Sequence, residues 1–186
     1  MSLYSCLEKQ IFEFENFKIV PIRYEDRFKI MEWRNEQIYH LRQDKPLTSE
    51  DQEYYFKNVI SHLFDQEKPS QILFSFLEND ICVGYGGLVH INWIDKNAEI
   101  SFIMKTDLEM NHFQSYWITY LGLIEQLAFN ELNLHKIYTY AFDLRPKLYD
   151  ALYNAGFTED ARLSEHCFFE SNYIDVVIHA KTNTLC

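Results

Sequence analysis

The sequence of 186 residues is poor in glycine, proline and cysteine, and it contains no long apolar run. With 5 glycines and 4 prolines, collagen-like and linker-rich compositions are excluded. No apolar run approaches the ~20 residues that a bilayer span needs, so we expect no membrane partner. The four cysteines, Cys6, Cys82, Cys167 and Cys186, are scattered, without a C-x-x-C pair or a histidine at metal-ligand spacing. Reduced thiols and no bound metal are therefore expected.

Positive charge is scarce as well. The chain has 17 Lys and Arg against 28 Asp and Glu, which gives a formal net charge of −11. An acidic chain without a local basic patch repels phosphate backbones, so a nucleic-acid partner is not expected. The first six residues, MSLYSC, lack the basic and apolar regions of a secretion signal, and we expect a cytoplasmic location.

Apolar and aromatic side chains, in contrast, are abundant. Apolar residues make up 47% of the sequence and aromatic residues 17%. This composition excludes a disordered chain, because so many apolar groups can form a core. The length suits one domain over residues 1–186.

Alternation of apolar and polar residues predicts seven strands, and apolar residues at three- and four-residue spacing predict four helices. The predicted strands cover residues 12–22, 72–77, 81–91, 98–104, 137–142, 163–170 and 173–180. The predicted helices cover residues 26–41, 48–63, 115–132 and 146–155. Their order, β-α-α-β-β-β-α-β-α-β-β, indicates an α/β or α+β fold with a mixed, mostly antiparallel seven-stranded sheet.

Local signals predict turns and helix ends. The dipeptides Asn79-Asp80 and Ser171-Asn172 are typical of hairpin turns. Ser49 and Gln52 have the spacing of a capping box at the start of the second helix. Gly156 follows the last predicted helix, where a glycine often ends a helix.

Four stretches, taken together, resemble a known family. They are Glu32-Trp33-Arg34-Asn35 with Leu47-Thr48-Ser49-Glu50; Ala98-Glu99-Ile100-Ser101-Phe102-Ile103; Ala128-Phe129-Asn130-Glu131-Leu132-Asn133-Leu134-His135-Lys136-Ile137; and Ala155-Gly156-Phe157 with Arg162 to His166 and Tyr173 to Val177. In order and spacing, over about residues 18–180, they resemble the GNAT superfamily of N-acetyltransferases. Within it they look closest to the branch of ribosomal-protein and nucleotide-amino-sugar N-acetyltransferases. The resemblance implies a GNAT fold with helices on both faces of the sheet.

The resemblance also implies acetyl transfer from acetyl-coenzyme A to an amine, by direct attack without a covalent enzyme intermediate. In similar folds the fourth strand splays from the fifth. Here this would free the backbone of Phe102, Ile103 and Met104 to pair with the pantetheine arm and to polarise the thioester carbonyl.

The family holds the pyrophosphate with a glycine-containing loop at a helix N-terminus, where free amides and the helix dipole favour anions. The matching positions in this chain are His112, Phe113, Gln114, Ser115 and Tyr116. Phe113 and Ser115 stand where the family has glycines, and Arg145 stands at a position where it often has asparagine. These six residues are the candidate cofactor-binding residues, together with the strand 102–104.

Glu99 is the candidate base, because an ammonium group has no lone pair and some base must remove its proton; the alternative is a solvated glutamate. Tyr149 and Tyr153 flank Leu152, the family's usual position for a tyrosine that protonates the leaving thiolate. Packing is the alternative role for both tyrosines. The candidate acceptor-binding residues are Arg34, Asn35, Arg42 and His90.

The sequence thus predicts an N-acetyltransferase acting on a small amine, with a nucleotide-linked amino sugar as the first candidate acceptor and a protein N-terminus as the second. The alternative is a GNAT-fold protein that has lost catalysis and binds a ligand or partner. The altered loop at residues 112–116 favours this alternative. Similar domains commonly form homodimers, so a homodimer is an expectation for this chain.

Overall fold

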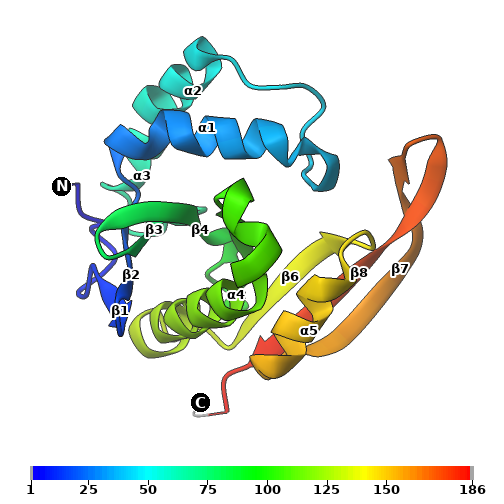
Figure 1. The fold of residues 1–186 in the computed structure, drawn as a ribbon. Helices are drawn as coiled ribbons and strands as arrows, with labels where there is room; N and C mark the ends of the chain where they lie inside the picture. Colours follow the sequence, from blue (N-terminus) through cyan, green and yellow to red (C-terminus); the bar gives the residue numbers. More distant parts are fainter. Residues whose placement is uncertain (1, 185–186) are drawn as a thin grey trace.

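The computed structural model of the protein describes residues 2–184 (Figure 1). Its strands are β1 (Phe12–Phe14), β2 (Phe17–Pro21), β3 (Ile72–Glu78), β4 (Ile81–Asn92), β5 (Asn97–Met104), β6 (Lys136–Phe142), β7 (Thr158–Phe169) and β8 (Asn172–Thr182). Its α-helices are α1 (Arg27–Glu36), α2 (Ser49–Tyr55), α3 (Ser61–Leu63), α4 (Glu109–Glu125) and α5 (Pro146–Asn154). Residues Phe56–Ile60 and Gln126–Glu131 are π-helical and extend α2 and α4, while Tyr24–Asp26, Ile38–His40 and Thr106–Leu108 are 3₁₀ turns.

Within residues 2–184 the eight strands form one sheet in the order β1-β2-β3-β4-β5-β6-β8-β7. All neighbouring pairs are antiparallel except β5 with β6, which are parallel. Helices α1 to α3 lie on one side of the sheet and α4 and α5 on the other, while the tip of the β7–β8 hairpin projects from the body (Figure 1). The predicted mixed, mostly antiparallel α/β architecture is confirmed.

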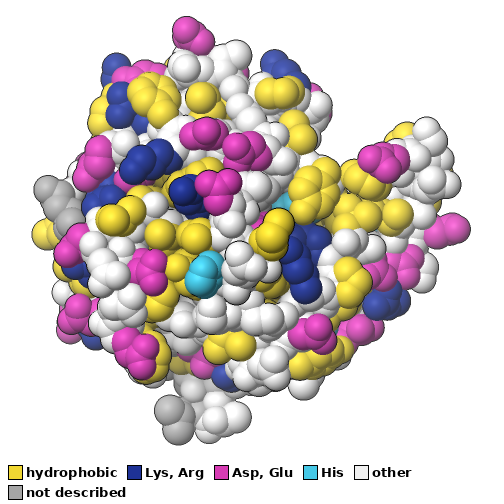
Figure 2. All heavy atoms as spheres, in the orientation of Figure 1, with side chains coloured by type: hydrophobic (Ala, Val, Ile, Leu, Met, Phe, Trp, Pro, Cys, Tyr) yellow, Lys and Arg dark blue, Asp and Glu magenta, His cyan; other side chains and the backbone are white. Residues whose placement is uncertain are grey.

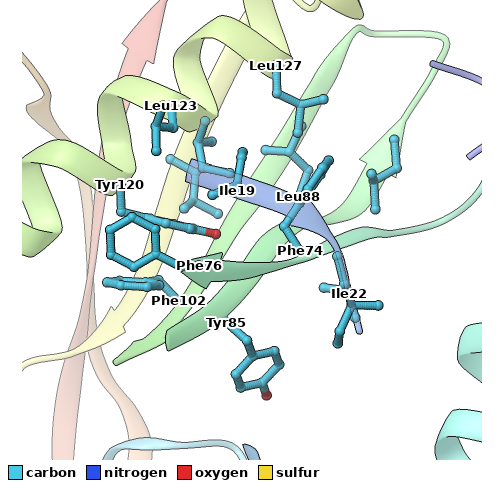
Figure 3. Packing of buried hydrophobic residues seen from close by; sticks show 14 of the residues in the cluster. Ile19, Ile22, Phe74, Phe76, Tyr85, Leu88, Phe102, Tyr120, Leu123 and Leu127 are labelled. Carbon is cyan, nitrogen blue, oxygen red and sulfur yellow. The ribbon is translucent and has the colours of Figure 1, made fainter. Parts of the chain in front are cut away.

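The main core lies between the sheet and α4. Tyr120 of α4 is fully buried, and its ring stacks on Phe102 of β5 with ring centroids 3.8 Å apart. Phe76 of β3 meets both rings edge to face. Figure 3 shows this cluster beneath α4, with Tyr85 on the other side of the strands. Because side chains alternate along a strand, Phe102 faces α4 while Glu99 and Ser101 face the side of α1 and α2.

Two predicted features of the strands differ from the structure. The predicted strand 12–22 is a hairpin, because Phe14 pairs with Phe17 around a turn in which Glu15 has a φ of 53°; the sheet of the described residues therefore has eight strands rather than seven. The predicted turn at 79–80 is confirmed, but the last hairpin turns one residue earlier than predicted, at Glu170 and Ser171.

The helix starts also differ. The cap of α2 is Thr48 with Asp51, so the capping box lies one residue before the predicted pair. Gln52 instead is buried and donates to the Arg27 carbonyl at 2.7 Å. The predicted end of the last helix is confirmed, with Gly156 at a φ of 82° just after it.

The surface carries both signs of charge despite the net charge of −11. On the face drawn in Figure 2, acidic, basic and apolar side chains lie interspersed. Among residues 2–184, every helix falls short of the length and apolar character that crossing a bilayer would require. Cys6, Cys82 and Cys167 are free thiols, and Cys186 lies outside the described residues.

Candidate active site

Strands β5 and β6 separate partway along their length, and this opens a cleft in the sheet. Of the described residues, only three pairs join them, and the last is Glu99 with Tyr138. Beyond that pair β5 continues beside β4 and β6 continues beside β8. The divergence of these two strands, expected from the resemblance, is confirmed. Each strand turns one edge toward the other without pairing to it, so backbone groups along these edges can bind an extended ligand.

The cleft encloses a cavity of about 120 Å³. Its lining includes Arg34, His40, Arg42, Glu99, Ser101, Phe102, Ile103, Trp117, Thr139, Tyr140 and Arg145. Of the three strand residues predicted to face the pantetheine arm, Phe102 and Ile103 line the cleft. Met104 does not, and its carbonyl accepts a hydrogen bond from Gln37 Nε2 at 2.8 Å.

Three buried polar atoms in this lining have no hydrogen-bond partner among residues 2–184. They are Trp117 Nε1, Thr139 Oγ1 and Arg145 Nε. Buried polar groups in folded proteins are almost always paired, so these atoms fit a ligand that brings its own polar groups into the cleft. A pantetheine arm, with two amides and a hydroxyl, has that character.

A second cavity, of about 510 Å³, lies between α1, α2 and the sheet. Its walls are largely apolar and aromatic, with Tyr54, Tyr55 and Tyr85 among them. Arg34 and Ser101 line both cavities, so the two spaces adjoin. This arrangement offers one space for a donor and another for an acceptor.

The predicted acceptor-binding residues take different positions. Arg34 donates to the Tyr85 hydroxyl at 2.7 Å and stands between the cavities. Asn35 lines neither cavity; its side chain bonds both the N–H and the carbonyl of Leu47 and so holds the loop before α2. His90 is largely exposed, has a φ of 50° and lines neither cavity.

Glu99 is buried at the point where β5 and β6 part, and its carboxylate lines the cleft. One oxygen is paired with the Arg42 guanidinium, and the other lies 3.8 Å from His90 Nε2. The predicted base thus stands at the cleft, with Arg42 paired to one carboxylate oxygen and His90 beside the other.

The segment predicted to be the pyrophosphate loop is helical instead. Helix α4 begins at Glu109 rather than at residue 115, so residues 112–116 lie inside its first turns. Phe113 and Tyr116 are buried, and the Tyr116 hydroxyl donates to Glu78 at 2.8 Å. Gln114 donates to the Lys147 carbonyl at 2.7 Å, while Ser115 bonds back to the His112 carbonyl. Backbone amides deep in a helix are used by the helix, so this segment cannot cradle phosphate as the glycine loop would.

Arg145 precedes α5 and is buried beneath the start of α4. Its guanidinium lies 2.5 Å from Glu109 Oε1 and 3.0 Å from His40 Nε2. Burial and the neighbouring Arg145 lower the pKa of His40 to about 3, so this imidazole is neutral at pH 7.

The two tyrosines of α5 point away from the cleft. Both rings pack on the buried His179 of β8, at centroid distances of 4.9 Å for Tyr149 and 5.2 Å for Tyr153. The Tyr149 hydroxyl donates to Asp143 at 2.7 Å, which together with burial raises its pKa. Neither tyrosine lines the cleft, so this geometry does not support the predicted position beside a leaving thiolate, and a catalytic role for either tyrosine stays a prediction.

Sequence reasoning missed Trp117, Thr139, His40 and Tyr85 as lining residues. Trp117 and Thr139 occur in a helical and an alternating pattern that indicate core positions, and nothing local marks them as facing a cleft. Tyr85 lies in a G-Y-G-G run, where the small neighbours were the available signal of close packing. Residues 2–184 contain no group of three or more His, Cys, Asp or Glu placed to hold a metal ion.

Splayed central strands, a cleft between them and an adjoining cavity beneath two helices define an acetyltransferase fold of the GNAT type. The sequence matches the family described as acetyltransferase (GNAT) domain over residues 19–178, and the chain belongs to this family.

The chain is also similar to particular acetyltransferases. It is 31% identical to the spermidine N(1)-acetyltransferase of Vibrio cholerae serotype O1 over 94 residues, which are 50% of this chain and 53% of that protein. The match thus spans about half the length of this curated relative.

Solved structures share the fold over most of the chain. A spermidine N-acetyltransferase from Vibrio cholerae in complex with CoA and spermine has a TM-score of 0.75 at 20% identity, with 90% of this chain and 95% of that chain covered. Mutant forms of the spermidine/spermine N-acetyltransferase SpeG from Vibrio cholerae have a TM-score of 0.73 at 23% identity, with 90% and 94% covered. A dodecameric structure of spermidine N-acetyltransferase from Vibrio cholerae has a TM-score of 0.70 at 22% identity, with 90% and 94% covered.

The match to the family confirms the predicted superfamily. The relatives named above are spermidine N-acetyltransferases, so they do not support the predicted branch of ribosomal-protein and nucleotide-amino-sugar N-acetyltransferases. The expected homodimer stays a prediction.

Proposed function

We propose that the protein is an acetyl-CoA-dependent N-acetyltransferase whose acceptor is a primary amine of a polyamine. The observation that carries the proposal is the cleft between β5 and β6, with the buried Glu99 carboxylate on its wall. Membership of the acetyltransferase (GNAT) domain family and similarity to spermidine N-acetyltransferases support it.

Acetyl-CoA would supply an activated thioester. The free edge of β5 at Phe102 and Ile103 would hold the donor arm, and a backbone N–H there would polarise the acyl carbonyl. Trp117, Thr139 and Arg145 would pair with polar groups of the same arm. Glu99 would take the proton of the acceptor ammonium, directly or through a water, so that the free amine attacks.

Several features suit a polycationic acceptor. The aromatic walls of the 510 Å³ cavity, with Tyr54, Tyr55 and Tyr85, offer faces on which ammonium groups bind. The net charge of −11 attracts polycations over a distance. Glu99 lines the cleft two residues before Ser101, which lines both cavities, and would supply a counter-charge for the reacting amine.

The test is an assay of acetyl transfer from acetyl-CoA to spermidine and to spermine. The release of free thiol measures the rate, and the mass of the product identifies the acetylated amine. Glu99→Gln should lower turnover at least ~100-fold, because the general base is lost. Its Kd for acetyl-CoA should stay unchanged. Glu13→Gln, on the exposed part of β1, is the matched control and should behave as wild type. Turnover with a peptide N-terminus and none with either polyamine would reject the polyamine acceptor.

A second candidate function rests on the helical segment 112–116. A GNAT-fold protein without a phosphate loop could bind another ligand or a partner without catalysing acetyl transfer. Thermal unfolding with acetyl-CoA decides between the two. At a hundredfold excess over Kd, binding stabilises by about 2.7 kcal/mol, which for a domain of this size raises Tm by roughly 5–10 °C. No shift in Tm would favour the second candidate.

A further inference from the structure

Two cations and one carboxylate meet where α4 and α5 begin, beside the cleft. Arg145 Nη2 lies 2.5 Å from Glu109 Oε1, and Lys147 Nζ lies 3.5 Å from Glu109 Oε2. Arg145 lines the cleft, and Lys147 lines a neighbouring hollow of about 450 Å³ at the start of α4. Glu109 therefore lies between the two cations and contacts one with each oxygen.

The aromatic ring of Phe113 joins this cluster. The Arg145 guanidinium lies 5.0 Å from the ring centroid and the Lys147 ammonium 4.2 Å from it. Cations at such distances are attracted to the face of an aromatic ring. Phe113 stands where the family has a loop glycine. The residue that replaces this glycine therefore also contacts the two positive charges.

Arg145 is only 8% exposed, and its Nε has no partner among the described residues. A buried guanidinium with an unpaired donor needs an acceptor, and Arg145 lines the cleft, where a ligand could supply one. The neighbouring His40 is neutral, so the cluster of Arg145, Lys147 and Glu109 carries one net positive charge.

From these contacts we infer that Arg145 and Lys147 bind the diphosphate of the donor by side-chain charge, in place of the missing amide loop, and that Glu109 competes with the diphosphate for both cations. This rests on the proposed function, since it concerns the same donor. A diphosphate oxygen can accept from the unpaired Arg145 Nε directly. It can accept from Arg145 Nη2 and Lys147 Nζ fully only as the Glu109 carboxylate gives up its contacts, because those two groups are paired with Glu109. Glu109 thus lowers the affinity of the protein for the donor.

The experiment is titration calorimetry with two donors, acetyl-CoA and S-acetylpantetheine, which carries the same thioester arm without phosphates. Glu109→Gln should lower the Kd for acetyl-CoA about tenfold, and Lys147→Gln should raise it about tenfold, which is about 1.4 kcal/mol in each direction. For S-acetylpantetheine the Kd of both variants should stay within about twofold of wild type, because this donor has no phosphate charge that could interact with the altered side chains.

Glu53→Gln and Lys57→Gln are the matched controls, since they alter a Glu–Lys pair between α2 and its π-helical extension, with a contact of 2.9 Å, and neither residue lines the cleft. Neither should change the Kd of either donor. Thermal unfolding of every variant checks that the fold is retained.

The outcomes separate the two proposals. If acetyl-CoA binds to wild type but both variants leave its Kd unchanged, or shift both donors equally, the diphosphate site is wrong and the proposed function stands. If wild type fails to bind acetyl-CoA and Glu109→Gln binds it, the role of Glu109 is supported. If no variant binds either donor, both the site and the proposed function are rejected.

Discussion

The carboxylate of Glu99 is paired with the guanidinium of Arg42 at the point where β5 and β6 separate. The Glu99 side chain is 8% exposed and the Arg42 side chain 49%, so a buried acid is held by a cation that reaches in from solvent. The Arg42 guanidinium also lies over the Tyr140 ring, 4.6 Å from its centroid. A cationic acceptor that approaches Glu99 must therefore share the carboxylate with Arg42.

This relationship predicts the effect of Arg42→Gln. Without the guanidinium, Glu99 can attract the acceptor ammonium unopposed, and one repulsive positive charge is removed. We expect the KM for spermidine to fall roughly two- to fivefold, in line with the ~1 kcal/mol of a partly exposed ion pair. Steady-state kinetics at fixed, saturating acetyl-CoA measures it.

Arg27→Gln is the matched control, because Arg27 pairs with Glu53 at 2.6 Å, away from the cleft. Its KM for spermidine should equal that of wild type. A KM that rises in Arg42→Gln would mean that Arg42 contacts the acceptor itself, and the competition with Glu99 would be rejected.

The tyrosines of α5 lead to a second prediction. Tyr149→Phe removes the hydrogen bond to Asp143 and should lower the free energy of unfolding by about 1 kcal/mol. Its kcat should not change, because the hydroxyl lies outside the cleft. Tyr153→Phe, at a half-exposed ring, should change neither quantity. A loss of kcat beyond tenfold in Tyr149→Phe at unchanged stability would restore a catalytic role.

The sequence predicted the elements well and their ends less well, for local reasons. Apolar spacing identified the central strands and the main helices, because burial of one face demands it. It could not divide residues 12–22 into β1 and β2, since Glu15-Asn16 is an unusual turn pair and the apolar alternation runs through it. It placed the start of α4 six residues late, because the apolar repeat was counted from Tyr116, whereas Phe113 already belongs to the buried face of the helix.

The site was predictable only in part, because it depends on contacts between distant segments. The position of Glu99 followed from one short motif on one strand. The orphaned atoms of Trp117 and Thr139 lie on α4 and β6, and only the divergence of β5 and β6 makes them part of one cleft. The pairing of Glu109 with Arg145 joins residues 36 positions apart, and only Arg145 occupied a position that the resemblance marked.

Two glycines give opposite predictions for the same substitution. A methyl group on Gly86 of β4 would lie 2.0 Å from the Ser101 carbonyl oxygen and 2.8 Å from Phe102 Cα. Gly86→Ala should therefore lower the free energy of unfolding by about 3 kcal/mol, since β4 and β5 would have to move apart. A methyl group on Gly122 of α4 meets, beyond its chain neighbours and the backbone of its own helix, no atom of the described residues within 4 Å.

Gly122→Ala should accordingly raise the free energy of unfolding by about 0.5–1 kcal/mol, because alanine is the better helix former. Urea unfolding of both variants measures the difference. Equal effects of the two substitutions would contradict the close approach of β4 to β5.

The buried imidazole of His40 predicts how stability depends on pH. Burial and the contact with Arg145 lower its pKa to about 3 in the folded protein, whereas an unfolded chain has a histidine pKa near ~6.5. Between these values the unfolded state binds the extra proton, so stability is full above pH ~6.5 and is lost as the pH falls toward 3.

His40→Gln removes this titration, because the amide stays neutral throughout. The free energy of unfolding of the variant, minus that of wild type, should therefore rise as the pH is lowered from 6.5 to 4. The expected gain is about 2–3 kcal/mol, from the ~1.4 kcal/mol that each pKa unit represents. His62→Gln, at an exposed position on α3, is the matched control and should give a flat difference curve. Parallel curves for wild type and His40→Gln would show that His40 is protonated as easily in the folded protein as in the unfolded chain. The conclusion that the imidazole beside Arg145 is neutral would then be rejected.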